Sequence, residues 1–340
     1  MVSERSLEVL RVIVQDYVAS REPVGSKSIV ERHSFGVSAA TIRNDMALLE
    51  DEELIAAPHT SSGRIPTDKG YRLFVNHLAD ARPLSVAQRT AIQRFLGESV
   101  DLSDVLGRTV RLLAQLTNQV AVVQMPSLSA SRIRHVELVA LAPRRLLSVM
   151  IMSSGAVQQR TIEVSSNYRD DDLARIRSLI NSSITDLTLA EAATKLNELT
   201  RTFSDDYLRV HIEPIARALL EQIIQNRTER LVMAGTANLV RTEEDFPSSI
   251  TPVLDAIEEQ VVLVRLFDEM NRDQHEVVVS IGRENHDDSL TEASILSSEY
   301  SSGGGDSARL GVVGPLRMDY SGNMAAVRAV AHYLSRLFGD

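Results

Sequence analysis

A short helical segment near the amino terminus carries side chains that could read the base edges of DNA. Helical spacing predicts that residues 38–52 bury Ile42, Met46 and Leu49 along one face. The opposite face and its flanks then present small or polar side chains, which are Ala40, Thr41, Arg43 and Asn44. An asparagine can pair with adenine and an arginine with guanine through two hydrogen bonds each, while alanine and threonine methyl groups can contact thymine. The segment is therefore predicted to be a recognition helix whose first half enters the major groove.

A polar turn after this helix supplies further candidate contacts. It offers hydroxyl groups, backbone amides and a guanidinium to phosphate oxygens or the minor groove. The candidates in the turn are His59, Thr60, Ser61, Ser62 and Arg64. Lys27 and Ser38, which precede the exposed face of the recognition helix, complete the predicted DNA-binding set. The alternative interpretation is an ordinary solvated helix face and turn that bind nothing.

The elements that must position these residues have the order of a winged helix-turn-helix. Apolar spacing and capping residues predict a helix from Ser3, a short helix from Ser26 to His33 and the recognition helix capped by Ser38. A hairpin of residues 54–57 and Ile65 follows, and then a helix capped by Thr67. Three helices followed by a small hairpin is typical of winged-helix DNA-binding modules. This context favours the DNA-reading interpretation of the candidate face.

The rest of the chain predicts a mixed α/β domain interrupted by an insertion. Apolar or alternating segments predict strands at 120–124, 134–141, 145–152, 156–164, 261–267, 276–281, 293–299 and 309–315. Helical spacing dominates residues 170–230 and returns at 322–338, with Val327, Val330, Leu334 and Leu337 inward. Strands, a helical block and more strands indicate one sheet domain split by a helical insertion.

The predicted fold class is therefore multidomain α+β. We expect a winged-helix domain over residues 1–82, a helical connector over 83–118, a sheet domain formed by 119–170 and 255–340, and an inserted domain over 171–254.

The overall charge of the chain is acidic, but its predicted contact segments are not. The 340 residues include 36 Lys and Arg against 46 Asp and Glu, for a formal net charge of −10. Such an average opposes binding to a phosphate backbone, which requires local positive charge. Residues 23–49 nevertheless carry a net charge of +1 and residues 54–79 one of +2, with the acidic run 50–53 between them. We expect DNA binding through a few local cations, with marked sensitivity to salt.

The sequence contains no constellation that indicates an enzyme, a metal site or a cofactor site. It has no cysteine, which excludes thiolate metal sites, catalytic thiols and redox switches. Glu284, His286, Asp287 and Asp288 lack regular ligand spacing and are predicted to lie in a solvated loop. The glycines at 303–305 are not followed by the Lys-Ser/Thr of a phosphate-binding loop. Because it also lacks a signal peptide and any apolar run of membrane-spanning length, we expect a cytoplasmic protein that is not an enzyme and does not bind membranes.

Several stretches resemble one known family. Residues 25–27, 38–46 and especially 58–72, which read PHTSSGRIPTDKGYR, closely resemble the bacterial heat-inducible transcription repressor HrcA family. The likeness continues in APRRLL at 142–147 and in GPLRMDY at 314–320, so that it covers nearly the whole chain.

The resemblance implies a winged-helix domain, a GAF-like sheet domain and an inserted dimerisation domain. It also implies a homodimeric repressor of chaperone and chaperonin operons, which binds double-stranded DNA at an inverted-repeat operator and is kept active by a GroEL-type chaperonin. One departure is Glu53, which stands where the family usually has a glycine that closes the recognition helix. The alternative function is a ligand-sensing winged-helix repressor, whose GAF-like domain binds a small-molecule effector in a cavity.

Overall fold

The computed structural model shows a mixed α+β protein with two compact units. It describes residues 3–59, 62–77, 85–97, 102–126, 131–153, 155–202, 206–225, 231–246, 248–270, 275–301 and 307–339. One unit is built mainly from residues 1–123 and 231–333, and the other mainly from residues 124–230. None of the described helices is long and apolar enough to cross a membrane.

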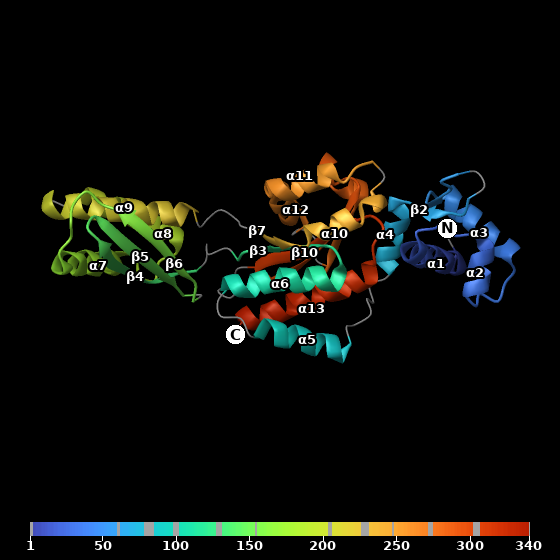
Figure 1. The fold of residues 1–340 in the computed structure, drawn as a ribbon, viewed down its shortest axis with the longest axis horizontal. Helices are drawn as coiled ribbons and strands as arrows, with labels where there is room; N and C mark the ends of the chain where they lie inside the picture. The colour runs from blue at the N-terminus through green and yellow to red at the C-terminus, as the bar shows by residue number, and fades with distance from the viewer. Residues whose placement is uncertain are drawn as a thin grey trace. The chain divides into compact units, whose positions relative to one another are not determined.

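The amino-terminal part of the chain, residues 3–77, forms what we call the N-terminal module. It contains α1 (Glu4–Ser20), α2 (Ser26–Arg32), α3 (Ala39–Asp51), β1 (Ile55–Ala56), β2 (Ile65–Pro66) and α4 (Asp68–His77), as Figure 1 shows. The two strands pair antiparallel, with Ile55 opposite Pro66. The predicted order of three helices, a hairpin and a further helix is therefore confirmed.

Local capping signals explain where these helices begin. The Ser3 hydroxyl accepts a hydrogen bond from the Ser6 amide, and the Ser38 hydroxyl accepts one from the Thr41 amide, as N-cap residues do. The N-cap of α2 is Gly25, one residue before the predicted Ser26. In the short α2, Ile29 is fully buried, whereas its neighbour Val30 is 36% exposed.

A five-stranded sheet with helices on both faces forms what we call the sheet domain. The strands lie in the order β7-β3-β10-β9-β8, with β3 (Val120–Gln124), β7 (Leu231–Ala234), β8 (Val278–Ile281), β9 (Ala293–Ser301) and β10 (Ser307–Pro315). In Figure 1, α5 (Val86–Gly97), α6 (Leu102–Thr117) and α13 (Tyr320–Gly339) cover one face. The other face carries α10 (Thr236–Arg241), α11 (Thr251–Glu259) and α12 (Val261–Met270). Short 3-10 turns occupy Glu243–Asp245, Gly282–Glu284 and Asp288–Leu290.

The second unit has its own sheet and core, and we call it the inserted unit. Its antiparallel strands β4 (Ile133–Ala142), β5 (Arg145–Met152) and β6 (Val157–Glu163) lie in that order, with Ser148 opposite Leu138 on one side and Arg160 on the other. Helices α7 (Asp170–Ile184), α8 (Leu189–Thr202) and α9 (Asp206–Gln225) contribute buried Ile176, Leu196 and Leu219 to one apolar core with these strands.

The predicted bounds of the sheet domain and the insertion are wrong in two places. Residues 133–163 belong to the inserted unit rather than to the sheet domain, and residues 231–254 belong to the sheet domain rather than to the insertion. The first error has a physical cause. Strand periodicity identifies a strand but not its partner, and β4, β5 and β6 satisfy one another through short hairpins.

Two further predictions about single elements need correction. Residues 261–267 are predicted as a strand but begin α12, in which Leu263, Leu266, Phe267 and Met270 are buried at helical spacing. Such short apolar runs do not distinguish a strand from a buried helix. Leu337 near the carboxyl terminus is 42% exposed rather than inward. The predicted connector is helical, and α5 and α6 form it.

Candidate nucleic-acid interface

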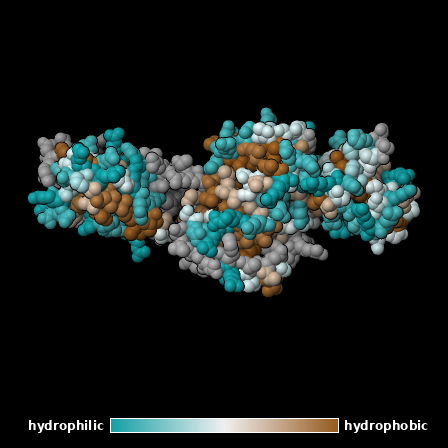
Figure 2. Space-filling view, viewed as in Figure 1, coloured by the Kyte–Doolittle hydropathy of each residue, from teal (hydrophilic) through white to brown (hydrophobic). Residues whose placement is uncertain are grey.

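The outer face of α3 presents the side chains that sequence periodicity placed there. Ile42 and Leu49 are fully buried, whereas Ala40, Arg43 and Asn44 are exposed. Thr41 lies half-buried at the edge of this face. The visible surface of the module is mainly hydrophilic, and hydrophobic side chains gather instead over the part of the sheet domain that carries α10–α12 (Figure 2). The predicted base-reading side chains therefore lie on an open, polar surface.

Asp45 is the one acidic residue of α3 that turns inward, and sequence reasoning missed its role. It is 3% exposed and accepts hydrogen bonds from Arg5 Nε at 2.8 Å, from an Arg5 terminal nitrogen at 3.2 Å and from the Ser6 hydroxyl at 3.1 Å. Its position three residues after Ile42 places it on the buried face, which was the available signal. The pair neutralises Asp45 and attaches α3 to the amino-terminal turn of α1.

The cations of the hairpin and of α4 are bound within the protein. Arg64 donates to Glu50 Oε2 from Nε at 3.0 Å and from a terminal nitrogen at 2.8 Å. Lys69 donates to the Glu52 carbonyl at 2.8 Å, and Arg72 pairs with Glu284. The three cations that give residues 54–79 their net charge of +2 are thus bound to partners within the protein.

Lys27 and Arg43 differ from the other cations of the module. Within the described residues of the module, they are the two Lys or Arg side chains that make no ion pair or side-chain hydrogen bond. Both line one groove of about 350 Å³ between the start of α2, α3 and the hairpin. Its remaining lining residues are Gly25, Ser26, Met46, Ala47, Glu50, Ser62, Gly63 and Arg64. The structure thus brings two predicted contact residues from different helices to the same exposed groove.

The predicted hydroxyl contacts have structural roles of their own. The Ser62 hydroxyl donates to the His59 carbonyl at 2.6 Å and accepts from the His59 amide at 3.0 Å, which closes the turn. The Ser38 hydroxyl lies 3.1 Å from that of Thr41. His59 is exposed, and Thr60 and Ser61 lie outside the described residues. Turn closure and capping therefore account for Ser38, Thr41 and Ser62 without a ligand.

A glycine allows the hairpin to lie against the segment before α2. Val24 and Arg64 exchange two backbone hydrogen bonds of 2.9 Å. A Cβ atom at Gly63 would lie 2.5 Å from the Pro23 carbonyl oxygen, closer than packed atoms allow. This close approach positions the hairpin beside the groove that Lys27 and Arg43 line.

The carboxyl end of α3 forms the usual left-handed cap without a glycine. Glu53 has φ of +58°, the Leu54 amide donates to the Leu49 carbonyl at 2.9 Å, and the Glu53 amide donates to the Glu50 carbonyl at 2.9 Å. These two bonds define a Schellman motif, in which glycine is preferred at the left-handed position. The Thr67 hydroxyl also donates to the Glu53 carbonyl at 2.6 Å. The helix therefore ends where the sequence indicates, with Glu53 in a conformation unfavourable for its type.

The acidic cluster after β8 is engaged in local contacts. A hydrogen bond from the Ser289 hydroxyl lowers the pKa of Asp287, which also pairs with Arg265 at 2.8 Å. Glu284 is bound by Arg72, and His286 lies 3.3 Å from Glu269. Among the residues that the structure describes, no group of three or more His, Asp and Glu side chains could hold a metal ion.

Comparisons with known proteins relate the chain to repressors over its full length. The family model described as the HrcA protein C terminal domain matches residues 103–324. A heat-inducible transcription repressor HrcA of Leifsonia xyli is 73% identical over 340 residues and is covered, like this chain, at 100%. Proteins of the same name from Clavibacter michiganensis and Streptomyces avermitilis are 67% and 52% identical, again with 100% of both chains covered.

A solved structure also shares the fold. The crystal structure of a hypothetical protein at 2.2 Å resolution matches with a TM-score of 0.69 over 99% of each chain, at 24% identity. The likeness supports the arrangement of elements along the whole chain.

Proposed function

The chain belongs to the HrcA family of heat-inducible transcription repressors, and we propose that its N-terminal module is a winged helix-turn-helix that binds an inverted-repeat operator as a homodimer. A transcription repressor acts on DNA, and this module contains the exposed face whose side chains suit that task. Its order of helices and hairpin matches that of winged-helix modules.

The groove lined by Lys27 and Arg43 is the observation that carries this proposal. Two exposed cations without internal partners, beside the base-reading face of α3, supply the local positive charge that an acidic chain needs in order to approach DNA. Arg43 is assigned to guanine, Asn44 to adenine, and the methyl groups of Ala40 and Thr41 to thymine.

The flanking residues are assigned to the phosphate backbone. Lys27 and the hairpin residues His59, Thr60, Ser61 and Ser62 would contact phosphate oxygens, as would Ser38 at the start of α3. Arg64 would join them by releasing Glu50, because its Nε and both terminal nitrogens donate within the protein.

We assign the other two parts of the chain to assembly and regulation. The sheet domain is proposed to be GAF-like, and the inserted unit, mainly residues 124–230, is proposed to be the dimerisation domain. An inverted repeat presents two half-sites about 34–36 Å or a multiple of that apart, so a dimer must hold two modules at a matching spacing.

Heat sensing is proposed to act through the stability of the repressor. If the active dimer is only marginally stable, a loss of about 1.4 kcal/mol makes the ratio of active to inactive protein about tenfold smaller. A GroEL-type chaperonin would restore the active form by rescuing inactive chains. A chain without cysteine has no thiol switch, which leaves folding and partner binding as the signals.

Nothing among the residues that the structure describes favours the ligand-sensing alternative. The groove of about 350 Å³ lies in the N-terminal module, and another of about 450 Å³ lies between β6 and α9 of the inserted unit. Neither lies in the sheet domain, where an effector of a GAF-like domain would bind.

A footprint tests the DNA-binding proposal directly. We expect the purified protein to protect an inverted repeat upstream of chaperone genes from the same genome, with matched protection of both half-sites. Protection of unrelated DNA to the same extent would contradict the proposal. Titrating the protein with operator DNA, with and without chaperonin, tests the proposed partner. If chaperonin does not change the fraction of protein that binds operator, the chaperonin has no part in the mechanism.

A further inference from the structure

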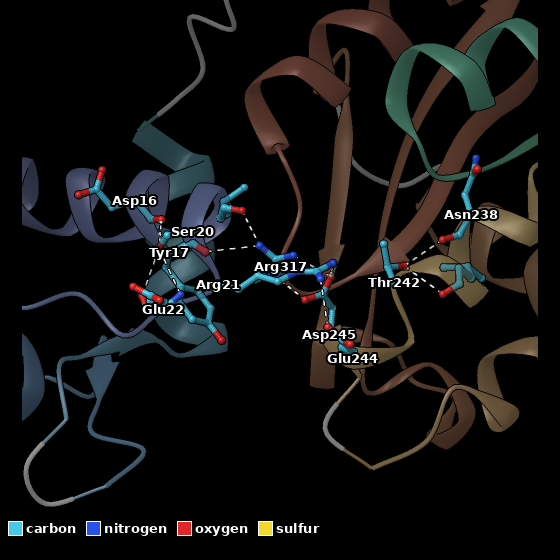
Figure 3. Close-up of polar contacts among 12 residues, drawn as sticks. Asp16, Tyr17, Ser20, Arg21, Glu22, Asn238, Thr242, Glu244, Asp245 and Arg317 are labelled. Atoms are coloured by element: carbon cyan, nitrogen blue, oxygen red, sulfur yellow. Dashed lines mark hydrogen bonds and ion pairs between the residues drawn. The ribbon is translucent and has the colours of Figure 1, made fainter.

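A largely buried ion pair within the sheet domain lies against the end of α1 in the N-terminal module. Arg317, between β10 and α13, donates from Nε to one carboxylate oxygen of Asp245 at 2.6 Å and from a terminal nitrogen to the other at 2.8 Å. The side chains are 12% and 5% exposed, and Figure 3 shows them facing each other. Such a bidentate pair fixes both position and orientation.

The remaining nitrogen of Arg317 reaches the carboxyl end of α1. It donates to the Tyr17 carbonyl at 3.4 Å (Figure 3) and also to the Val18 carbonyl. Carbonyls in the last turn of a helix lack partners within the helix and carry a partial negative charge, so a guanidinium there is favourable. Arg21, which caps α1, pairs with Asp245 at 3.1 Å from the module side.

The other end of α1 is bonded to the recognition helix. Arg5 and Ser6 bind the buried Asp45 of α3, directly after the base-reading Arg43 and Asn44. With 17 residues, α1 is about 25 Å long. One helix thus connects Asp245 and Arg317 of the sheet domain to the Asp45 side chain of α3 through charge-assisted contacts at each end.

We propose that Arg317 is a positioning residue for operator binding, which sets the recognition helix relative to the sheet domain through α1. The proposal rests on the DNA-binding function assigned above. It adds a route, from Asp245 through Arg317 and α1 to Asp45, by which the state of the sheet domain determines where α3 is presented.

A second contact joins the same two parts at α4, and the proposal assigns it the role of a pivot. Tyr71 and Tyr320 pack with ring centroids 5.5 Å apart, and Arg72 donates to the Val279 carbonyl at 2.6 Å as well as to Glu284. The Arg72 and Glu284 side chains are 29% and 39% exposed, so solvent screens that pair more than it screens Arg317. Losing Arg317 should therefore leave the module attached but free to turn about α4.

Distance measurements without DNA test the positioning step alone. The chain has no cysteine, so the variant Glu31→Cys/Asp255→Cys carries one label in the module and one in the sheet domain. We expect Arg317→Met to broaden the distance distribution and Arg317→Lys to restore it in part. The matched control is Arg309→Met, since buried Arg309 contacts Ser297 and Met270 inside the sheet domain. An unchanged distribution in Arg317→Met, or equal broadening in Arg309→Met, would overturn the proposal.

Affinities for a full operator and for a single half-site test whether positioning by Arg317 affects DNA binding. Arg317→Met should weaken full-operator binding at least about fivefold, the lower range of coupling between sites, because two modules must be presented together. Half-site affinity should change by less than about twofold, since α3 itself is intact. Equal losses on both DNAs would show damage to the module and reject the positioning role. If Arg317→Met does not fold, Asp245→Asn tests the same bond. Should the unmodified protein bind neither DNA while the distances still broaden, the assigned function fails and the structural coupling stands.

Discussion

Glu50 of the recognition helix holds Arg64 of the hairpin through one carboxylate oxygen, at 2.8 and 3.0 Å from two guanidinium nitrogens. The pair ties the hairpin to α3. Arg64 is 27% exposed and Glu50 37%, so the bond lies at the surface. On the proposed function, a DNA phosphate and Glu50 would therefore compete for the same guanidinium.

Glu50→Gln should release Arg64 and strengthen non-specific DNA binding. One additional phosphate contact steepens the dependence of log affinity on log salt by about 0.9. Measuring affinity for random duplex DNA over a range of salt concentrations gives this slope. The control is Glu8→Gln, which also frees an exposed arginine, Arg11, but on α1 away from the groove. An identical slope in Glu50→Gln and the unmodified protein would show that Arg64 does not reach phosphate.

Replacing the base-reading residues should abolish discrimination between sequences. Arg43→Ala and Asn44→Ala each remove one bidentate base contact, worth about 1–3 kcal/mol of discrimination, while the dimer and the fold persist because both side chains are exposed. Competition of operator against random DNA measures the loss. Arg11→Ala removes an exposed arginine on α1 and should keep the full preference. If Arg43→Ala or Asn44→Ala also keeps the full preference for operator over random DNA, another face of the module reads the bases.

The parts of the fold that sequence predicted are those set by neighbours along the chain. Ser38 begins α3 because its hydroxyl reaches an amide three residues later, and Ile42, Met46 and Leu49 face inward because helical spacing places them together. The exposed face with Arg43 and Asn44 follows from the same spacing. Such short-range relations can be seen in any single sequence.

The parts that sequence missed depend on pairings between distant residues. Arg5 and Asp45 are separated by 40 positions, and Arg317 meets Val18 across 299. No local pattern indicates that Arg64 will bind Glu50, or that residues 231–234 will pair with β3 in the sheet domain. An aspartate on the buried side of α3 indicates that it has a partner, but only the folded structure identifies that partner as Arg5.

Glycine at position 53 should stabilise the module. The left-handed backbone costs a residue other than glycine about 1–2 kcal/mol, and the extra freedom of glycine in the unfolded chain offsets about 0.4–1 kcal/mol of that. Glu53→Gly should therefore raise the free energy of opening α3 by about 0.5–1 kcal/mol, measured by hydrogen exchange at its last amides. Glu53→Ala removes the same charge but keeps the strain, so it should gain little. An equal gain in the free energy of opening in Glu53→Gly and Glu53→Ala would show that loss of the charge, rather than relief of strain, causes the effect.

Alkaline pH should destabilise the protein through its buried tyrosines. Burial raises the pKa of Tyr320, whose hydroxyl donates to the Leu316 carbonyl at 2.8 Å, although a hydrogen bond with Ser294 partly opposes the shift. In the unfolded chain a tyrosine ionises near pH 10. The folded state therefore binds more protons above that pH, and its stability is fully present below about pH 10 and is lost as pH rises.

Tyr320→Phe should accordingly flatten the fall of unfolding free energy above about pH 10, by about 1.4 kcal/mol for each pH unit over which the folded tyrosine stays protonated. Denaturant unfolding at a series of pH values, with phenolate absorbance recorded in parallel, measures both effects. Ser294→Ala is the control, because it removes the same hydroxyl contact but keeps the buried phenol, and so should retain the steep alkaline dependence. The unfolding free energy of Tyr320→Phe could instead fall with pH as steeply as that of Ser294→Ala. Other groups would then dominate the alkaline transition, such as Tyr71 and Tyr300, whose pKa values burial also raises.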